Sequence, residues 1–120
     1  PYNFGTDFVV YTGTHDNNTL KGWYKNETNK KSRKRLDDYV GYKVTADTIS
    51  WELIRLSMSS VASVAVTPMQ DIMELEETHR MNTPSTLNNN WQWRLDWGML
   101  KKEQTERLIN MTKIYGRVVL

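Results

Sequence analysis

The sequence contains no cysteine, which excludes disulfide bonds and thiolate metal sites. It also lacks any apolar run near the roughly 20 residues that a membrane-spanning helix needs. An excess of charge of one sign is missing as well, because 16 basic side chains stand against 14 acidic ones, for a formal net charge of +2. A balance so close to neutral creates no field that would attract a polyanion. We therefore expect neither a membrane nor a nucleic acid as partner.

The length of 120 residues allows one modest core, whereas a complete eight-stranded α/β barrel takes about 250. The chain begins at Pro1 with neither an initiator methionine nor a basic and apolar leader. We therefore expect it to begin inside a longer polypeptide.

Hydrophobic patterning predicts short strands alternating with helices. Two apolar runs, at residues 6–11 and 61–67, have the composition of strands buried on both faces of a parallel sheet. Apolar residues recur at helical spacing in residues 45–60 and 101–115, and residues 69–75 add a further helical turn. Helix followed by strand is half of a βα repeat. The pattern predicts an α/β fold that is mostly helical, with about two short parallel strands.

The sequence also predicts a helix cap and a buried helix face. We expect Asn17 or Asn18 to cap a short helix through residues 19–24. Ile49, Leu53 and Leu56 should form the buried stripe of the helix in residues 45–60.

A basic run occupies Lys30 to Arg35, where five of six residues are Lys or Arg. Such runs occur in nuclear-targeting and phosphate-binding segments. Asp37, Asp38 and Glu27 flank this run and dilute its field. We interpret it as a solvated helix at the periphery of the fold.

The most distinctive polar cluster follows the first apolar run. The sequence Tyr11-Thr12-Gly13-Thr14-His15-Asp16-Asn17-Asn18 places an aspartate, a histidine and two amides where a buried strand would end. Enzymes of the α/β class keep catalytic side chains at such places. Taken by itself, an aspartate after a strand is more often a turn or cap residue, so both interpretations stay open at this point.

A second polar block follows the second apolar run. It consists of Met69-Gln70-Asp71, then Arg80-Met81-Asn82-Thr83-Pro84, then Trp91-Gln92-Trp93-Arg94-Leu95. Gln70 and Asp71 could meet the hydroxyls of a ligand or cap the next helix, and support ranks ahead of direct contact. The spacing of His15, Asp16 and His79 is not typical of a zinc site, so we assign no metal.

These two blocks, in this order, resemble the 4-α-glucanotransferases called amylomaltases or disproportionating enzymes. The resemblance spans nearly the whole chain and implies that residues 1–120 are the C-terminal part of a catalytic (β/α)8 TIM barrel. The full-length relative would move a segment of an α-1,4-glucan to the 4-hydroxyl of glucose or of a maltooligosaccharide by a retaining double displacement. The resemblance further implies an α-glucan or maltooligosaccharide substrate, no cofactor and a cytoplasmic location.

The same resemblance implies roles for individual residues. Asp16 matches the family's third catalytic carboxylate, which stabilises the transition state, and His15 beside it contacts a substrate hydroxyl. Asn82, Gln70 and Asp71 are the further candidates for substrate binding. The nucleophile and the acid/base belong to earlier barrel strands, so we expect the chain alone to be inactive.

Two places depart from the family's pattern. Ser85 stands where the family normally has glycine, which leaves the loop geometry around Asn82 and Pro84 less defined by the motif. The stretch Glu74 to Thr78 replaces a glycine-rich one. The resemblance also makes Trp91 and Trp93 packing residues that seat the last helix, ahead of a role as sugar platforms.

Two other functions compete with this interpretation. The aromatic content would suit a carbohydrate-binding module, although such modules are usually all-β. A helical interaction module would use residues 101–115 as its binding face. If the chain is part of a barrel, strand edges are left uncovered, and we expect it to self-associate with residues 8–11, 49–56 and 61–66 buried.

Overall fold

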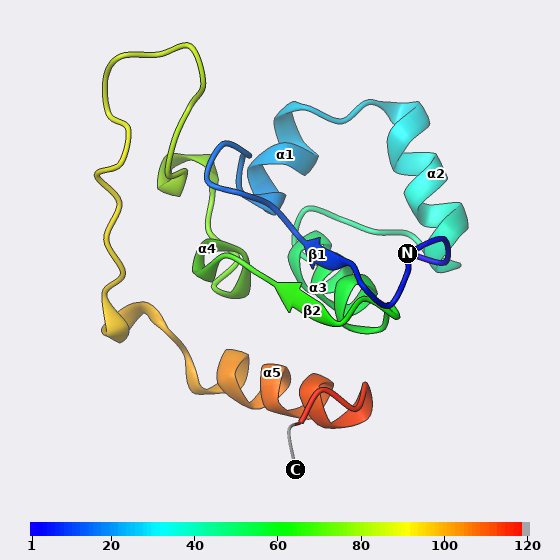
Figure 1. The fold of residues 1–120 in the computed structure, drawn as a ribbon. Coiled ribbons are helices and arrows are strands. Elements are labelled where there is room, and N and C mark those ends of the chain that lie inside the picture. Colours follow the sequence, from blue (N-terminus) through cyan, green and yellow to red (C-terminus); the bar gives the residue numbers. More distant parts are fainter. Residues whose placement is uncertain (119–120) are drawn as a thin grey trace.

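The computed structural model describes residues 1–118 and confirms an α/β arrangement that is mostly helical. The elements are β1 (Val9–Tyr11), α1 (Leu20–Asn26), α2 (Lys30–Val40), α3 (Ile49–Met58), β2 (Val64–Val66), α4 (Met69–Ile72), the 3-10 turns η1 (Glu77–His79) and η2 (Trp97–Met99), and α5 (Lys102–Ile114). The two strands run parallel and lead toward α1 and α4 (Figure 1). This helical content contradicts an all-β carbohydrate-binding module.

The strand pair is covered on one face only. Ala65 of β2 packs against the α3 cluster, and it pairs with Val10 of β1. The opposite face, called here the open face, exposes four side chains by 39–53%: Val9, Tyr11, Val64 and Val66. Phe8 and Val61 are also exposed, by 48% and 58%. The prediction that both strands are buried on two faces is therefore wrong for this chain, because its helices cover only one side.

Helix α3 lies at the centre of the main core. Trp51, Ile54 and Met58 form a buried cluster with Ile72. Helix α5 packs on this cluster through three half-buried residues of one stripe, Leu108, Met111 and the following Tyr115. The apolar stripe of α5 therefore faces its own chain, which contradicts its use as a free partner-binding face.

The predicted stripe of α3 is correct in only one of its three residues. Ile49 is fully buried, whereas Leu53 and Leu56 are half-buried. The side chains that the pattern missed, Trp51 and Ile54, lie on the face that meets α4 and α5. An amphipathic period locates the buried side of a helix only to within about one residue, and here three neighbouring elements widen that side.

Thr19 caps α1, which corrects the prediction of Asn17 or Asn18. The Thr19 hydroxyl accepts a hydrogen bond from the Gly22 amide at 3.1 Å. Gly22 is closely packed here, because a Cβ at this position would lie 2.3 Å from Asn18 Oδ1 and 2.9 Å from Glu77 Cβ. The side chain of Asn18 is thus packed against the helix rather than free to cap it.

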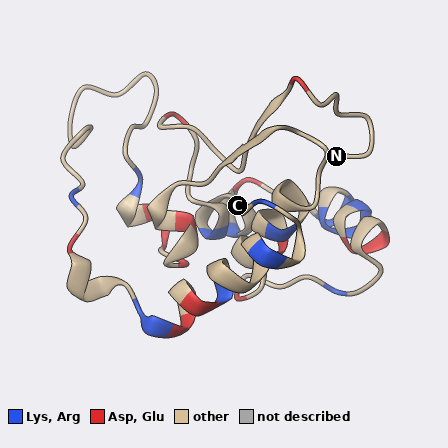
Figure 2. Ribbon diagram, turned by 60° about the horizontal axis from the view of Figure 1, so that its bottom comes forward, with Lys and Arg blue, Asp and Glu red and all other residues tan. Residues whose placement is uncertain are grey.

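Helix α2 carries the basic run and is the solvated helix that the sequence predicts. Every residue of α2 is exposed or half-buried. Figure 2 shows that this helix carries acidic as well as basic residues. The Asp38 carboxylate pairs with the Lys34 ammonium at 2.9 Å. A reciprocal Asn29 and Ser32 capping box begins the helix, and Gly41 ends it at a φ of 87°.

The chain after α5 returns to the end of α3. Gly116 adopts a φ of 63°, which turns the backbone so that Arg117 can reach the carboxyl end of α3. The Arg117 guanidinium donates to the carbonyls of Met58, Ser60 and Ala62 at 2.6–3.0 Å. The bond to Met58 satisfies a carbonyl that the helix end leaves unpaired, and the other two hold the segment between α3 and β2. Within residues 1–118, no helix is both long and apolar enough to cross a membrane.

Candidate active site

A tight turn after β1 presents His15 and Asp16. Thr12 extends the pairing of the strands by donating to the Val66 carbonyl at 3.2 Å. The Asn17 side chain then closes the turn, because its Oδ1 accepts from the Thr14 amide at 2.7 Å and from the Thr14 hydroxyl at 3.0 Å. The two side chains between them remain 56% and 51% exposed.

The second block supplies the partner of this turn. Asn82 Nδ2 donates to Asp16 Oδ1 at 2.7 Å, and the backbone N–H of Asn82 donates to the His15 carbonyl at 3.1 Å. His15 Nε2 lies 3.4 Å from the same Asp16 Oδ1. The structure therefore brings together three of the five predicted site residues, although 66 positions separate Asp16 from Asn82.

Asp71 occupies a buried position that ties β1 to α1. Only 2% of the residue is exposed. Its Oδ1 accepts from the Leu20 amide at 2.8 Å, and its Oδ2 accepts from the Thr12 hydroxyl at 3.2 Å. Burial raises the pKa of Asp71 to about 6, against the lowering effect of these two hydrogen bonds. This carboxylate thus fixes both ends of the turn that carries Asp16.

Gln70 lies beside Asp71 and supports the neighbouring segment. It is 8% exposed, and its Nε2 donates to the His79 carbonyl at 3.3 Å. His79 Nδ1 in turn accepts from the Trp93 indole at 3.1 Å. These contacts hold η1, from which the chain continues to Asn82.

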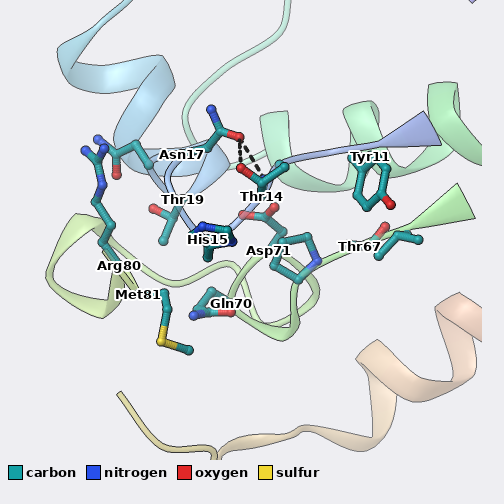
Figure 3. A pocket seen from close by; sticks show the side chains of 14 residues that line it. Tyr11, Thr14, His15, Asn17, Thr19, Thr67, Gln70, Asp71, Arg80 and Met81 are labelled. Atoms are coloured by element: carbon teal, nitrogen blue, oxygen red, sulfur yellow. Dashed lines mark hydrogen bonds between the residues drawn. The ribbon is translucent and has the colours of Figure 1, made fainter. Parts of the chain in front are cut away.

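A cavity of about 550 Å³ opens where the two strands end (Figure 3). Its walls come from the turn after β1, the end of β2, the start of α4 and the segment after η1. Tyr11, His15, Gln70, Asp71 and Met81 are among the lining residues. Asp16 and Asn82 lie next to the cavity through their lining neighbours. The carboxyl ends of parallel strands are the usual place for a ligand in α/β folds.

Two residues at this site were not assigned to it from the sequence. Trp91 is 54% exposed and its ring lies 5.0 Å from that of His15, at an angle of 40°. The prediction that Trp91 seats the last helix is therefore wrong. Its φ of 62° and the bond from its amide to the Met81 carbonyl at 2.8 Å place it there. A tryptophan at positive φ has no local sequence signal.

Arg80 is the other residue that was not assigned to the site from the sequence, although it belongs to the second polar block. Its Nη2 donates to the Asp16 carbonyl at 2.8 Å. The side chain is only 17% exposed. Its place two positions before Asn82 was the available signal, because residues at that spacing in an extended segment lie on the same side.

The groups gathered here are suited to binding hydroxyls. Imidazole, amide and hydroxyl side chains line the cavity together with Tyr11, Val66 and Met81, a mixture of polar and apolar groups that suits a sugar. In the part of the chain that the structure describes, no cluster of three His, Cys, Asp or Glu side chains could hold a metal ion.

Comparison with known proteins gives consistent results. Residues 1–101 match the family model described as 4-alpha-glucanotransferase. The chain is 42% identical over 118 residues to the 4-alpha-glucanotransferase of Streptococcus pneumoniae serotype 4, covering 98% of this chain and 23% of that protein. It is 38% identical over 122 residues to the chloroplastic/amyloplastic 4-alpha-glucanotransferase of Arabidopsis thaliana, covering 98% and 21%.

A solved structure supports the same assignment. The amylomaltase of Streptococcus agalactiae in complex with acarbose superposes with a TM-score of 0.86 at 30% identity, over 95% of this chain and 23% of that one. The chain thus spans about a quarter of the length of the relatives it matches. With a family model matched across most of its length, the chain belongs to the 4-alpha-glucanotransferase family.

Proposed function

We propose that residues 1–120 are the C-terminal part of the catalytic (β/α)8 barrel of a 4-α-glucanotransferase, called here the longer enzyme. The longer enzyme would cleave an α-1,4-glucan, hold the donor segment covalently and pass it to the 4-hydroxyl of glucose or a maltooligosaccharide. The nucleophile and the acid/base would come from other parts of the barrel. The chain alone would then be inactive.

The observation that carries this proposal is the meeting of the two polar blocks. The turn with His15 and Asp16 and the segment with Asn82 converge beside a cavity at the carboxyl ends of parallel strands. In a TIM barrel that end holds the active site. A turn or cap aspartate would need no such partner from 66 positions away.

Asp16 would stabilise the transition state through the hydroxyls of the reacting sugar. Asn82 engages its Oδ1, which leaves Oδ2 to accept from a sugar hydroxyl. Such bonds gain strength as positive charge develops on the ring. His15 would donate to a neighbouring hydroxyl. The ring of Trp91 behind it would keep the imidazole in place.

Gln70 and Asp71 would contribute differently from Asp16. Both are nearly buried and both hold backbone groups of the site. We propose that their main effect on substrate binding is to shape the cavity wall. Direct contact of either side chain with a glucose hydroxyl is the secondary possibility, since both residues line the cavity.

The open face supports the barrel part of the proposal. Parallel sheets are normally covered on both faces. In a barrel one face of each strand meets helices and the other meets the packed interior. Ala65 faces the helices here, and the open-face valines would face that interior.

The proposed partner is an α-glucan or maltooligosaccharide. We propose a cytoplasmic location by resemblance to the family, while the plant relative is named chloroplastic/amyloplastic. No cofactor is needed for the proposed chemistry, because carboxylates perform both displacements.

A transfer assay with labelled acceptor tests the proposal. The longer enzyme is incubated with maltotriose and isotopically labelled glucose, and the products are separated by length. We expect the label in maltooligosaccharides, joined through new α-1,4 bonds, because retention preserves the anomeric configuration. Hydrolysis of maltotriose with the label left in free glucose would contradict transferase function. Binding without turnover would favour a carbohydrate-binding module.

A further inference from the structure

Arg80 connects three parts of the site through its guanidinium group. Nη2 donates to the Asp16 carbonyl at 2.8 Å, and Nε donates to the Asn82 carbonyl at 2.8 Å. Nη1 lies 3.7 Å from Glu27 Oε1. A guanidinium is a rigid plane with donors in fixed directions, so binding three groups fixes their relative positions.

The two carbonyls that Arg80 binds belong to the two residues whose side chains bind each other. Asn82 Nδ2 donates to Asp16 Oδ1 at 2.7 Å. The guanidinium therefore sets the backbone of both the donor and the acceptor in this bond. The Asn82 amide adds a further bond to the His15 carbonyl at 3.1 Å. Consecutive carbonyls of the catalytic turn are thus held from one segment.

Glu27 holds the guanidinium from the other side. It is the residue that ends α1, and its Oε1 also accepts from Asn18 Nδ2 at 2.9 Å. Asn18 lies two positions after Asp16 and is 7% exposed. Glu27 therefore contacts the turn directly through Asn18 and indirectly through Arg80, which ties the turn to α1.

We propose that Arg80 is a positioning residue that holds the Asp16 carboxylate in the orientation required for glycosyl transfer. This inference rests on the proposed function. Arg80 itself touches the backbone of the turn and acts through Asp16. A misplacement of a catalytic group by about 1 Å can cost roughly 100-fold in rate, so loss of the Arg80 guanidinium should lower turnover even where the fold survives.

The test measures kcat and KM for maltotriose in the longer enzyme. For Arg80→Ala we expect kcat to fall about 10- to 100-fold with KM changed less than about threefold, because removing an interaction that acts mainly in the transition state lowers kcat and leaves ground-state binding nearly unchanged. Arg80→Lys should fall between this variant and the parent, since one ammonium cannot serve three directions. Millimolar guanidinium should restore part of the activity of Arg80→Ala, and it should not raise the activity of the parent.

Arg33→Ala is the matched control. Arg33 also donates to backbone and hydroxyl groups, at the Tyr24 carbonyl and the Thr28 Oγ1, but it does not contact the turn. This variant should lose stability while it keeps kcat. A purely structural role of Arg80 would make the two variants alike in both measurements.

Two outcomes overturn the inference. One is an Arg80→Ala enzyme that keeps parental kcat while the parent transfers glucosyl units, which leaves the proposed function intact. The other is a loss of kcat in Arg80→Ala that added guanidinium does not restore, together with an equal loss of kcat in Arg33→Ala when the two variants have lost the same amount in melting temperature. If Arg80→Ala does not fold, parental kcat in Arg80→Lys has the same meaning. A parent without transfer activity contradicts the proposed function, and the inference with it.

Discussion

The carboxyl ends of β1 and β2 and the open face of the same strands differ in what completes them. At the ends, polar groups from distant parts of the sequence bind each other, as Asn82 binds Asp16 and Asp71 binds Leu20 and Thr12. On the open face, Val64 and Val9 are 47% and 46% exposed beside each other. One region has its partners within the chain, and the other has apolar side chains without cover in residues 1–118.

This difference indicates that the two regions would have different roles in the proposed enzyme, one in catalysis and the other in stability. The polar arrangement around Asp16 can form from this chain, because all of its known contacts come from it. In the proposed enzyme, the cover of the open face would come from outside residues 1–118. We therefore expect substitutions at the strand ends to lower catalysis. Substitutions on the open face should lower the stability of the longer enzyme and have little effect on the stability of residues 1–120 by themselves.

The largest expected effect is that of Asp16→Asn on turnover. The amide oxygen can still accept from Asn82, so the turn should persist, whereas the negative charge that would stabilise the proposed transition state is lost. We expect kcat of the longer enzyme to fall by a factor of about 100 or more, equivalent to about 2.7 kcal/mol. Initial rates of glucose release from maltotriose measure this change.

Asp47→Asn serves as the control for that measurement. The Asp47 side chain is 87% exposed and lies outside the cavity lining. Its turnover should stay close to the parental value. Near-parental turnover in Asp16→Asn, or a loss explained by a collapsed melting transition, would remove Asp16 from the catalytic group.

The next largest effect concerns the open face. Val64→Thr would bury an unpaired hydroxyl if other barrel strands cover this face, so we expect the free energy of unfolding of the longer enzyme to fall by about 1–2 kcal/mol. In a chain of residues 1–120 the same change should cost less than about 0.5 kcal/mol, because the site is half-exposed there. Denaturant unfolding of both proteins gives the two values.

Val61→Thr is the matched control, since Val61 is 58% exposed and precedes β2. It should be close to neutral in both proteins. Equal and small effects of Val64→Thr in the two proteins would mean that the open face stays exposed in the longer enzyme. The distinction between the two regions would then be lost.

The smallest expected effect is a pH dependence caused by Asp71. Its folded-state pKa is about 6 and its ordinary value is 3.8, so between these values the folded state binds more protons than the unfolded state. The contribution of this group to stability therefore grows as the pH falls. From about pH 7 to about pH 5.5 we expect a gain of about 0.8 kcal/mol relative to Asp71→Asn.

Denaturant unfolding of parent and Asp71→Asn at the two pH values measures this difference. Asp47→Asn should show the same pH dependence as the parent, because the Asp47 side chain is exposed and contacts Lys21, not Asp71. If Asp71→Asn and the parent change in parallel, burial does not raise the pKa of this carboxyl. The tie between β1 and α1 would then be more solvated than the structure indicates.

Helices were the part of the fold that the sequence predicted well. The period of apolar residues in α5 and the charge of α2 are local properties, and both elements form where expected. The burial of the strands was predicted wrongly for a physical reason. An apolar strand indicates that its faces need cover, but it does not say whether the same chain supplies it.

The sequence predicted which residues form the candidate site better than it predicted the hydrogen bonds and contacts between them. His15, Asp16 and Asn82 were named from motifs, and the structure brings them together. The spacing of Arg80 and Asn82 indicates that Arg80 lies near the site, but it does not predict the bond to the Asp16 carbonyl, which joins positions 64 apart and involves backbone. The place of Trp91 depends on its φ of 62°, which the neighbouring residues do not dictate.

Maltotriose turnover by the longer enzyme and by residues 1–120 alone, at equal molar concentration, tests the central claim most directly. The claim is that the chain holds a transition-state-stabilising carboxylate and its supports, while the nucleophile and the acid/base lie elsewhere in the barrel. We predict glucose and longer maltooligosaccharides from the longer enzyme and unchanged maltotriose from the chain alone. Products that form at a rate proportional to the concentration of the chain alone would contradict the account.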